Sequence, residues 1–439
     1  MLMMATAEMA PDFVRGDDTG LAIPAHTDAL REAGAAFLTA AFRAFGAIGS
    51  DNAVRRITRW EEVRAGNSGH KLALSVEYER PDAALDTELF VKFSRDFADP
   101  FRDRRRHELQ AEVRLAELSR HSAFPVTVAK PYFADFHQAS GTGLLIMRSI
   151  RFGEGGIEPR HVKCMDHMLP NALECYRATV TALARLAAAH RAGRLSPDVE
   201  RLFPYDRPAA TADLSWTWDV ASLRAAIQRL RDFAARAPQL LPPAASDRAF
   251  LDRLERDALA FLHHEQAVRS FLHADPDLIA LCHWNTNLDN AWFWRDAGGQ
   301  LQCGLLDWGM VRQMNVAYGL WGGLSAADPT MLEQHLDELL VLFAAELAVN
   351  GGPRLELSEL RLHFDLALAL IGIALMLDLP RLIDERLPEA LTARGPHDRL
   401  VCSDTVVHGF LTVSGNFLNL WARHDFGAAL ERMLMRARD

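Results

Sequence analysis

The sequence is poor in lysine. Of its 48 basic residues only four are lysines (Lys71, Lys92, Lys130 and Lys163), so a lysine inside an apolar strand is unusual for this chain. Acidic residues outnumber basic ones, 58 to 48, and the net charge is −10. This balance argues against a general binder of nucleic acid or of anionic membranes. The basic run at residues 102–107 is interrupted by an acid and is best explained as a solvated helix face.

Cysteine is scarce as well, and long apolar runs are absent. The five cysteines are scattered without C-x-x-C spacing, which predicts neither a disulfide framework nor a zinc motif and favours a reduced, cytoplasmic setting. The N-terminus lacks the basic segment of a secretory signal. The longest uncharged apolar run, residues 366–377, is too short to span a bilayer and predicts a buried helix.

The first third of the chain changes from a helical to a strand-like period. Residues 1–25 suggest a loosely packed arm, and residues 27–48 have the apolar spacing of a helix. Strand-like patterns follow at residues 54–63, 72–78 and 88–93, then a charged helix at 101–120, then strands at 126–134 and 143–147. Three strands, a helix and two strands predict a small β-sheet lobe.

The remainder is mostly helical. Helices are predicted at residues 171–192, 218–235, 249–271, 330–349, 358–377 and 406–421. One strand pair, at residues 291–294 and 302–306, interrupts this half and is joined by a turn at Asp296 to Gly299. The aromatic residues of this pair are expected to pack in the core.

Two polar segments flank that strand pair. Residues 283–290 are HWNTNLDN and residues 305–309 are LLDWG. A phosphoryl-transfer site uses a His-x-Asp-x-x-x-x-Asn segment, whose Asp orients the nucleophile and whose Asn holds Mg²⁺, followed by a second metal-binding Asp. His283, Asn290 and Asp307 match this pattern, whereas Asn285 stands at the position of the catalytic Asp. The segments therefore indicate binding of ATP and Mg²⁺ more strongly than catalysis.

These motifs resemble those of the aminoglycoside phosphotransferase and choline kinase branch of the protein-kinase-like superfamily, over about residues 50–330. The resemblance implies an α+β, two-lobed fold with a small antiparallel β lobe, one helix in that lobe, and a large helical lobe. The expected boundaries are an N-terminal arm and helix in residues 1–49, a nucleotide-binding lobe in 50–150, and a large lobe in 151–439 that carries the catalytic and metal loops.

The resemblance also implies roles for individual residues. Lys92, in LFVKF, would bind the α- and β-phosphates, and Glu112, in AEVRL, would hold that lysine. Asn290 and Asp307 would bind Mg²⁺. The remaining assignments are a nucleotide-covering loop of Gly66, Asn67, Ser68 and Gly69, an adenine-contacting segment that begins at Met147, and His283 as the motif histidine beside Asn285.

Three positions depart from the pattern of this branch. Asn285 replaces the catalytic Asp, and Trp284 replaces the small residue that usually precedes it. Gly319, in AYGL, stands where the branch usually has an Asp. The residues expected to bind the nucleotide are therefore mostly present, whereas those expected to activate the acceptor are partly replaced.

Other interpretations of the same residues stay open at this point. Lys92 suits an edge strand that it protects from aggregation, and Glu108 competes with Glu112 for the role on the helix. A second register, HAD at residues 273–275, retains the acid but places Ala280 where the metal-binding Asn is expected, so the register at residues 283–290 is preferred. Asp275 and Asp289 are both candidates to replace the missing carboxylate.

The expected function is ATP-dependent transfer of a phosphoryl group to a hydroxyl of an unidentified small molecule. The alternative is a catalytically impaired pseudokinase that serves as a nucleotide-binding or scaffold module. A third option, transfer of a different part of the nucleotide, has no support in the motifs. The partners expected are a small-molecule acceptor, with no nucleic acid and no membrane, and the sequence does not indicate an oligomeric state.

Overall fold

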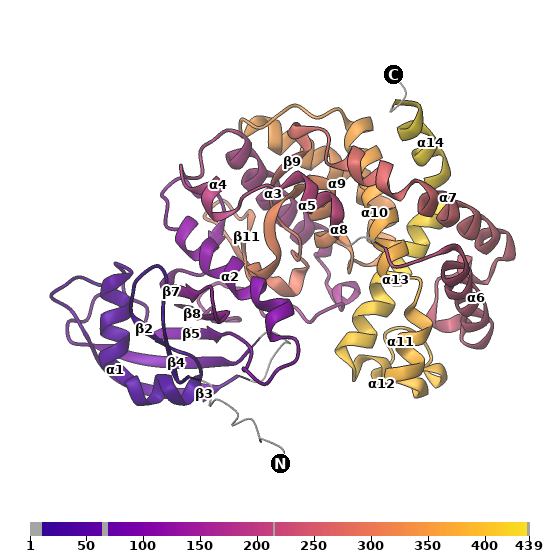
Figure 1. Cartoon of the computed structure of the whole chain (residues 1–439). Helices are drawn as coiled ribbons and strands as arrows, with labels where there is room; N and C mark the ends of the chain where they lie inside the picture. Colours follow the sequence, from indigo (N-terminus) through magenta and orange to yellow (C-terminus); the bar gives the residue numbers. More distant parts are fainter. Residues whose placement is uncertain (1–10, 64–68, 214–215, 437–439) are drawn as a thin grey trace, which may run out of the picture. The chain divides into compact units, whose positions relative to one another are not determined.

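The computed structural model describes residues 11–63, 69–213 and 216–436 (Figure 1). The chain divides into two compact units. The first unit comprises Met1–Arg151 and Leu306–Val311, and the second comprises Phe152–Leu305 and Arg312–Asp439. The short segment that carries Asp307 therefore belongs to the first unit, although it lies far from the rest of that unit in the sequence.

The first unit contains an antiparallel five-stranded sheet in the order β3-β4-β5-β8-β7. Alternate residues of β4, such as Leu72, Leu74 and Val76, are buried, as the two-residue period of a strand requires. The strands predicted in this region are observed, except that residues 126–134 divide into two. The bounds are β3 (Val54–Glu62), β4 (Lys71–Tyr78), β5 (Glu88–Phe93), β6 (Thr127–Val128), β7 (Pro131–His137) and β8 (Thr142–Arg148).

Two helices complete this unit. Helix α1 (Thr27–Ala44) packs aromatic rings against β7, with 5.3 Å between the ring centroids of Phe42 and Tyr132. Helix α2 (Arg102–Leu118) contributes Leu109 and Val113 to the same core as the sheet. The apolar stripe of each helix predicted this burial, because residues three and four apart share a helix face.

The prediction of a loosely packed arm is wrong for residues 13–24. Strands β1 (Phe13–Arg15) and β2 (Ala22–Pro24) form an antiparallel hairpin, and Ile23 is fully buried. The carboxylate of Asp135, which is also fully buried, accepts hydrogen bonds from the backbone N–H groups of Asp18 and Thr19 at 3.1 and 3.0 Å. The strands are too short for a periodic signal, and the acceptor lies more than a hundred residues away in the sequence.

The second unit is mostly helical (Figure 1). Several of its helices begin after an aspartate whose carboxylate accepts a backbone N–H of the first turn, such as Asp219 and Asp328, the usual N-cap arrangement. The predicted helices are observed as α3 (Ala172–Arg191), α6 (Val220–Arg236), α7 (Arg248–Leu272), α9 (Pro329–Val349), α10 (Leu357–Leu375) and α13 (Thr405–Arg423). The others are α4 (Val199–Leu202), α5 (Arg207–Ala212), α8 (Val316–Leu324), α11 (Leu379–Arg386), α12 (Arg399–Cys402) and α14 (Phe426–Arg436).

A β-hairpin lies within this unit, where the sequence predicted it. Strands β10 (Ala291–Arg295) and β11 (Leu301–Leu305) pair in antiparallel register, and the side chain of Asp296 accepts backbone N–H groups of the turn at 2.9 and 3.0 Å. Trp292 and Phe293 are buried, as expected for core residues. Two strands that the sequence did not reveal, β9 (Ile279–His283) and β12 (Val311–Asn315), form a two-stranded sheet.

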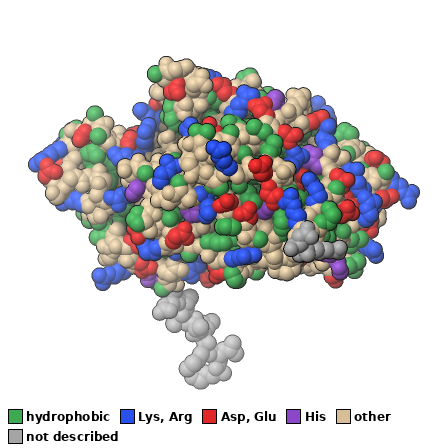
Figure 2. Space-filling model, turned by 90° about the horizontal axis from the view of Figure 1, so that it is seen from above, with side chains coloured by type: hydrophobic (Ala, Val, Ile, Leu, Met, Phe, Trp, Pro, Cys, Tyr) green, Lys and Arg blue, Asp and Glu red, His purple; other side chains and the backbone are tan. Residues whose placement is uncertain are grey.

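The predicted apolar helix is α10. The stretch Leu357–Arg386 has the length and apolar composition of a membrane span, but 72% of its most apolar window is buried inside the protein, as in a core helix. The expectation of a buried helix is therefore met. On the face shown in Figure 2, basic and acidic side chains are interspersed, in keeping with the modest net charge. The combination of a small antiparallel β unit and a larger helical unit confirms the predicted fold class.

Candidate functional site

A buried ion pair joins β5 to α2 in the first unit. The Nζ atom of Lys92 lies 2.9 and 2.7 Å from the two carboxylate oxygens of Glu112, and both residues are buried. Strand β5 lies between β4 and β8, so Lys92 is in the interior of the sheet. The interpretation as an edge-strand lysine is therefore wrong.

Asp307 reaches the same lysine from the segment that joins the first unit late in the sequence. Its Oδ1 atom lies 3.1 Å from Nζ of Lys92, and its side chain is 43% exposed. Asp307 adopts the left-handed backbone conformation, with φ 59° and ψ 56°, which costs a non-glycine residue roughly 1–2 kcal/mol. Gly309 in the short helix η6 (Trp308–Met310) lies against α2, because a Cβ atom there would be 3.2 Å from Cβ of Glu108. Strained backbone of this kind is found mostly at functional sites.

The charged groups of this cluster shift one another's pKa values. Burial by itself lowers the pKa of Lys92, but the carboxylates of Glu112 and Asp307 outweigh it and raise that pKa above its ordinary value. Burial also raises the pKa of Glu112, and the ammonium of Lys92 opposes this effect. Lys71, the cross-strand partner of Lys92, has a lowered pKa because of burial and of repulsion by Lys92. Lys92 is therefore a cation at neutral pH, with two carboxylates fixed around it.

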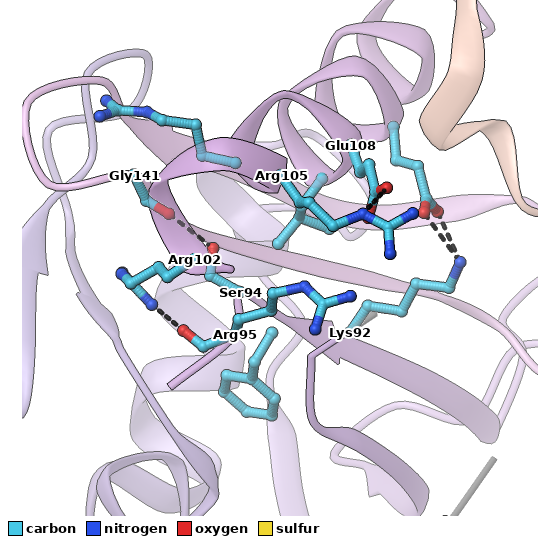
Figure 3. A pocket seen from close by; sticks show the side chains of 11 residues that line it. Lys92, Ser94, Arg95, Arg102, Arg105, Glu108 and Gly141 are labelled. Carbon is cyan, nitrogen blue, oxygen red and sulfur yellow. Dashed lines mark hydrogen bonds and ion pairs between the residues drawn. The ribbon is translucent and has the colours of Figure 1, made fainter. Parts of the chain in front are cut away.

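A small recess opens beside Lys92 and is lined by several arginines (Figure 3). Within it, Arg105 pairs with Glu108 at 2.7 Å, and Oγ of Ser94 donates a hydrogen bond of 2.8 Å to the backbone carbonyl of Gly141. Of the two glutamates that the sequence left open, Glu112 contacts Lys92 and Glu108 is held by Arg105.

The predicted nucleotide-covering loop is described only at its end. Gly66, Asn67 and Ser68 lie outside the described residues. Gly69 has φ +60°, and a Cβ atom there would lie 2.0 Å from the backbone oxygen of Phe93, so only glycine fits. Gly69 also borders an open hollow of about 400 Å³ that is lined by His70, Arg95 and Arg105 among others. The end of the loop thus lies against β5, one residue beyond Lys92.

Met147 lies near the end of β8 and is half-buried. Its register partner on β5 is Phe90, and the backbone N–H of Ser149 donates to the carbonyl of Glu88 at 2.9 Å. The segment predicted to contact adenine is therefore the place where the chain leaves β8 and the sheet of the first unit.

The predicted catalytic loop belongs to the second unit and is tied together by its own polar groups. His283 is fully buried, and its Nδ1 atom accepts the backbone N–H of Asn285 at 3.2 Å. The Nδ2 atom of Asn290 donates to the backbone carbonyl of Asn285 at 3.0 Å. Asn285 also accepts, through Oδ1, a hydrogen bond of 3.1 Å from Nδ2 of Asn287. His283, Asn285 and Asn290 are thus brought together, and the oxygen of the Asn290 amide is the atom suited to a metal ion.

The two candidate replacement carboxylates face other groups. Asp275 accepts the backbone N–H of Asp277 at 2.9 Å, as the cap of the short helix η4 (Pro276–Leu278), and it interacts electrostatically with His363. Asp289 interacts electrostatically with Asp166 and Tyr176. Asp166 is buried, and burial together with repulsion from Asp289 raises its pKa to about 7 against a hydrogen bond from Tyr176.

Sequence reasoning missed the glycines of α8 that lie against this loop. A Cβ atom at Gly322 would be 1.7 Å from the backbone oxygen of Trp284, and one at Gly323 would be 2.4 Å from Oγ1 of Thr286. Gly319 lies close to β9 with a looser contact, because a Cβ atom there would be 3.1 Å from Cβ of Cys282. The glycine that replaces the usual Asp therefore lets α8 approach β9. The sequence GLWGGL at residues 319–324 was the available signal, since glycine inside a helix usually has a packing reason.

Comparison with known proteins gives a distant likeness. No protein-family model matches the chain, and no curated protein matches it. The similar solved structures include a choline/ethanolamine kinase family protein from Mesorhizobium loti, with 14% identity, a TM-score of 0.39, and coverage of 81% of this chain and 92% of that one. Another is an ethanolamine kinase of Plasmodium vivax, with 12% identity, a TM-score of 0.42 and 83% coverage of both chains. A third is the GDP complex of aminoglycoside 2'-phosphotransferase-IIIa, with 14% identity, a TM-score of 0.39, and coverage of 80% of this chain and 94% of that one. These are proteins of the protein-kinase-like superfamily, from the branch that the motifs resemble, and at such identities and TM-scores they carry no conclusion on the activity of this chain.

Proposed function

We propose that this protein is an ATP-dependent phosphotransferase that acts on a hydroxyl group of a small molecule. The observation that carries the proposal is the cluster of Lys92, Glu112 and Asp307, in which a cation and two carboxylates are assembled from three separate segments. A purely structural ion pair would not need Asp307, whose side chain is 43% exposed and whose backbone is held in a strained conformation.

The roles are those that the resemblance implies, and the chemistry of each group suits its role. We assign Lys92, held by Glu112, to the α- and β-phosphates of ATP, and the Gly66–Gly69 loop and Met147 to the phosphates and the adenine. Asp307 and Asn290 supply the oxygen ligands that Mg²⁺ prefers. Each residue offers an oxygen atom that suits this ion. Asp307 offers a carboxylate that already attracts the ammonium of Lys92, and Asn290 offers the oxygen of an amide whose nitrogen donates to the loop. When bound, Mg²⁺ would neutralise the phosphate charge.

Asn285 limits the rate that this site can reach. Phosphoryl transfer depends mainly on positioning and charge stabilisation, and a general base contributes about 10²–10⁴ in rate. An amide does not accept a proton at neutral pH, although its carbonyl can orient a hydroxyl. His283 supports the loop by fixing the backbone at Asn285. The residues therefore predict a slow enzyme.

The alternative is a pseudokinase that binds nucleotide without turnover. It rests on Asn285, whose amide does not accept a proton at neutral pH and whose Oδ1 atom already accepts one hydrogen bond, from Asn287.

The two functions are separated by measuring ADP release from Mg-ATP with a panel of hydroxylated acceptors, amino alcohols and aminoglycosides among them. The enzyme is supported by acceptor-dependent release that Asp307→Ala abolishes and that Asn285→Asp increases by about 10² or more. Nucleotide binding without release from any acceptor, in the wild type and in Asn285→Asp alike, would support the pseudokinase instead.

A further inference from the structure

Three side chains with metal-binding atoms meet in the second unit, beside the β10–β11 hairpin. The ligand atoms of Glu158, His161 and Cys175 all lie within 4.8 Å of one another, and Nε2 of His161 is 3.8 Å from Oε2 of Glu158. Cys175, in the first turn of α3, is fully buried, and the side chain of His161 is 7% exposed. No spacing motif connects these residues, so the group was not predictable from the sequence.

Strand β10 fixes the segment that carries two of the three residues. The backbone N–H of Glu158 donates to the carbonyl of Phe293 at 2.8 Å, and Ile157 forms a β-bridge with Trp294. The ring of His161 stacks on that of Phe293, with 5.0 Å between centroids and 19° between planes. The carboxylate and the imidazole are therefore positioned by backbone and ring contacts that do not involve their ligand atoms.

His161 has an unsatisfied hydrogen-bonding capacity within the described part of the chain. Its Nδ1 atom is buried without a hydrogen-bond partner among the described residues, and Nε2 is too far from Glu158 for a hydrogen bond. Buried polar atoms are nearly always paired, and an exception often marks a bound ion or water.

The imidazole is in the form that binds a metal, whereas the thiol must first lose its proton. Burial raises the pKa of the Cys175 thiol to about 12, with a further rise from the charge of Glu158, and burial lowers the pKa of His161. The imidazole is therefore neutral at pH 7, which is the form that binds metals. The thiol keeps its proton until a cation replaces it.

We propose that Glu158, His161 and Cys175 bind a divalent transition-metal cation of the zinc class. Thiolate, imidazole and carboxylate are the usual ligands of Zn²⁺, whereas a thiolate disfavours Mg²⁺ and Ca²⁺. Bonds of about 2.0–2.3 Å to a tetrahedral ion place the ligand atoms roughly 3.3–3.8 Å from one another. The ligand atoms, now up to 4.8 Å apart, therefore need to move closer by at most about 1 Å. Binding releases the thiol proton to solvent, and the thiolate and carboxylate balance the charge of the ion.

Such an ion would fasten the segment containing Glu158 and His161 to α3, against the strand that directly follows Asn290. This attachment does not depend on phosphotransfer. Three protein ligands leave the fourth position to water. Because the ion binds the folded state, zinc raises the midpoint of thermal unfolding.

The test uses the full-length protein after treatment with a chelator, titrated with Co²⁺ and then with Zn²⁺. The wild type is expected to bind one equivalent of Co²⁺, with thiolate-to-cobalt charge-transfer absorption in the near ultraviolet that Zn²⁺ removes. Cys175→Ser is expected to lose this absorption. Glu158→Gln, at a partly exposed side chain, is expected to bind zinc at least about tenfold more weakly, because even second-shell changes cost about 10–100-fold.

Cys402→Ser is the matched control. Cys402 lies 3.8 Å from His408, which contacts His397, so these residues form the rival cluster of the second unit. The proposal is overturned if the wild type binds no stoichiometric metal, or if the absorption survives in Cys175→Ser and disappears in Cys402→Ser. If Cys175→Ser fails to fold by circular dichroism, Glu158→Gln decides: zinc affinity equal to that of the wild type contradicts the proposal.

Discussion

Replacement of Glu112 by alanine would leave the ammonium of Lys92 buried with Asp307 as its remaining carboxylate partner at 3.1 Å. Removal of one member of a buried ion pair costs about 3–5 kcal/mol, because the other charge stays desolvated. Asp307 is 43% exposed, so its interaction with Lys92 is weakened by solvent and offsets only part of the loss. We expect Glu112→Ala to lower the free energy of unfolding of the first unit by about 3 kcal/mol.

The matched control is the double variant Lys92→Met with Glu112→Leu. Buried ion pairs replaced by apolar residues of similar volume are often neutral or stabilising, and Asp307 can be solvated once Lys92 is gone. The double variant is therefore expected to be at least as stable as the wild type, while each single variant is destabilised.

Hydrogen exchange measured on peptides from β5 and α2 follows this unit directly, and urea unfolding supplies the global value. A loss below about 1 kcal/mol in Glu112→Ala, the level of an exposed pair, would refute the reasoning. So would a double variant destabilised by the sum of the two single changes.

Two further predictions concern the second unit. Gly322→Ala forces a Cβ atom to 1.7 Å from the backbone oxygen of Trp284, so it should shift α8 and lower the midpoint of thermal unfolding. The control is Gly415→Ala in α13, where a Cβ atom meets nothing within 4 Å, and it should stabilise the protein by about 0.5–1 kcal/mol. Equal effects of the two variants would contradict the packing argument. Burial raises the pKa of Asp166 from 3.8 to about 7. Between pH 4 and 7 this carboxyl is therefore protonated in the folded protein and ionised in the unfolded chain, so the free energy of unfolding falls as the pH rises through that range. Asp166→Asn removes that penalty, up to about 4 kcal/mol, and its advantage in urea unfolding should grow from pH 4.5 to 7.5; a constant difference would show that Asp166 ionises normally.

The regular elements were predictable because their signals are local. A two-residue apolar period identified the strands of the sheet, and a longer helical period identified α3, α7 and α10 within a few residues. Strands β9 and β12 were missed because a buried run of five residues is too short to distinguish from the start of a helix. The hairpin of β1 and β2 was missed because its turn is fixed by the distant Asp135.

The residues of the candidate site also differ in whether a local signal in the sequence identifies them. Motifs within short segments of the sequence led to the choice of Lys92, His283, Asn290 and Asp307. The sequence favoured Glu112 over Glu108 only through its apolar neighbours, because residues four apart share a helix face. The structure distinguishes the two glutamates, because Arg105 pairs with Glu108 and Lys92 pairs with Glu112.

Contacts between distant segments hid the rest. The glycines of α8 matter because Trp284 and Thr286 approach them. Glu158, His161 and Cys175 are brought together only by the packing of α3 and β10.

The central claim is that the cluster of Lys92, Glu112 and Asp307 binds the phosphates and metal of ATP. A thermal-shift titration with ATP, with and without Mg²⁺, tests it on the wild type and on Asp307→Ala. The account predicts a Mg²⁺-dependent rise of the unfolding midpoint with ATP in the wild type, and its loss in Asp307→Ala. No rise with ATP in the wild type, or an equal rise in Asp307→Ala, would contradict it.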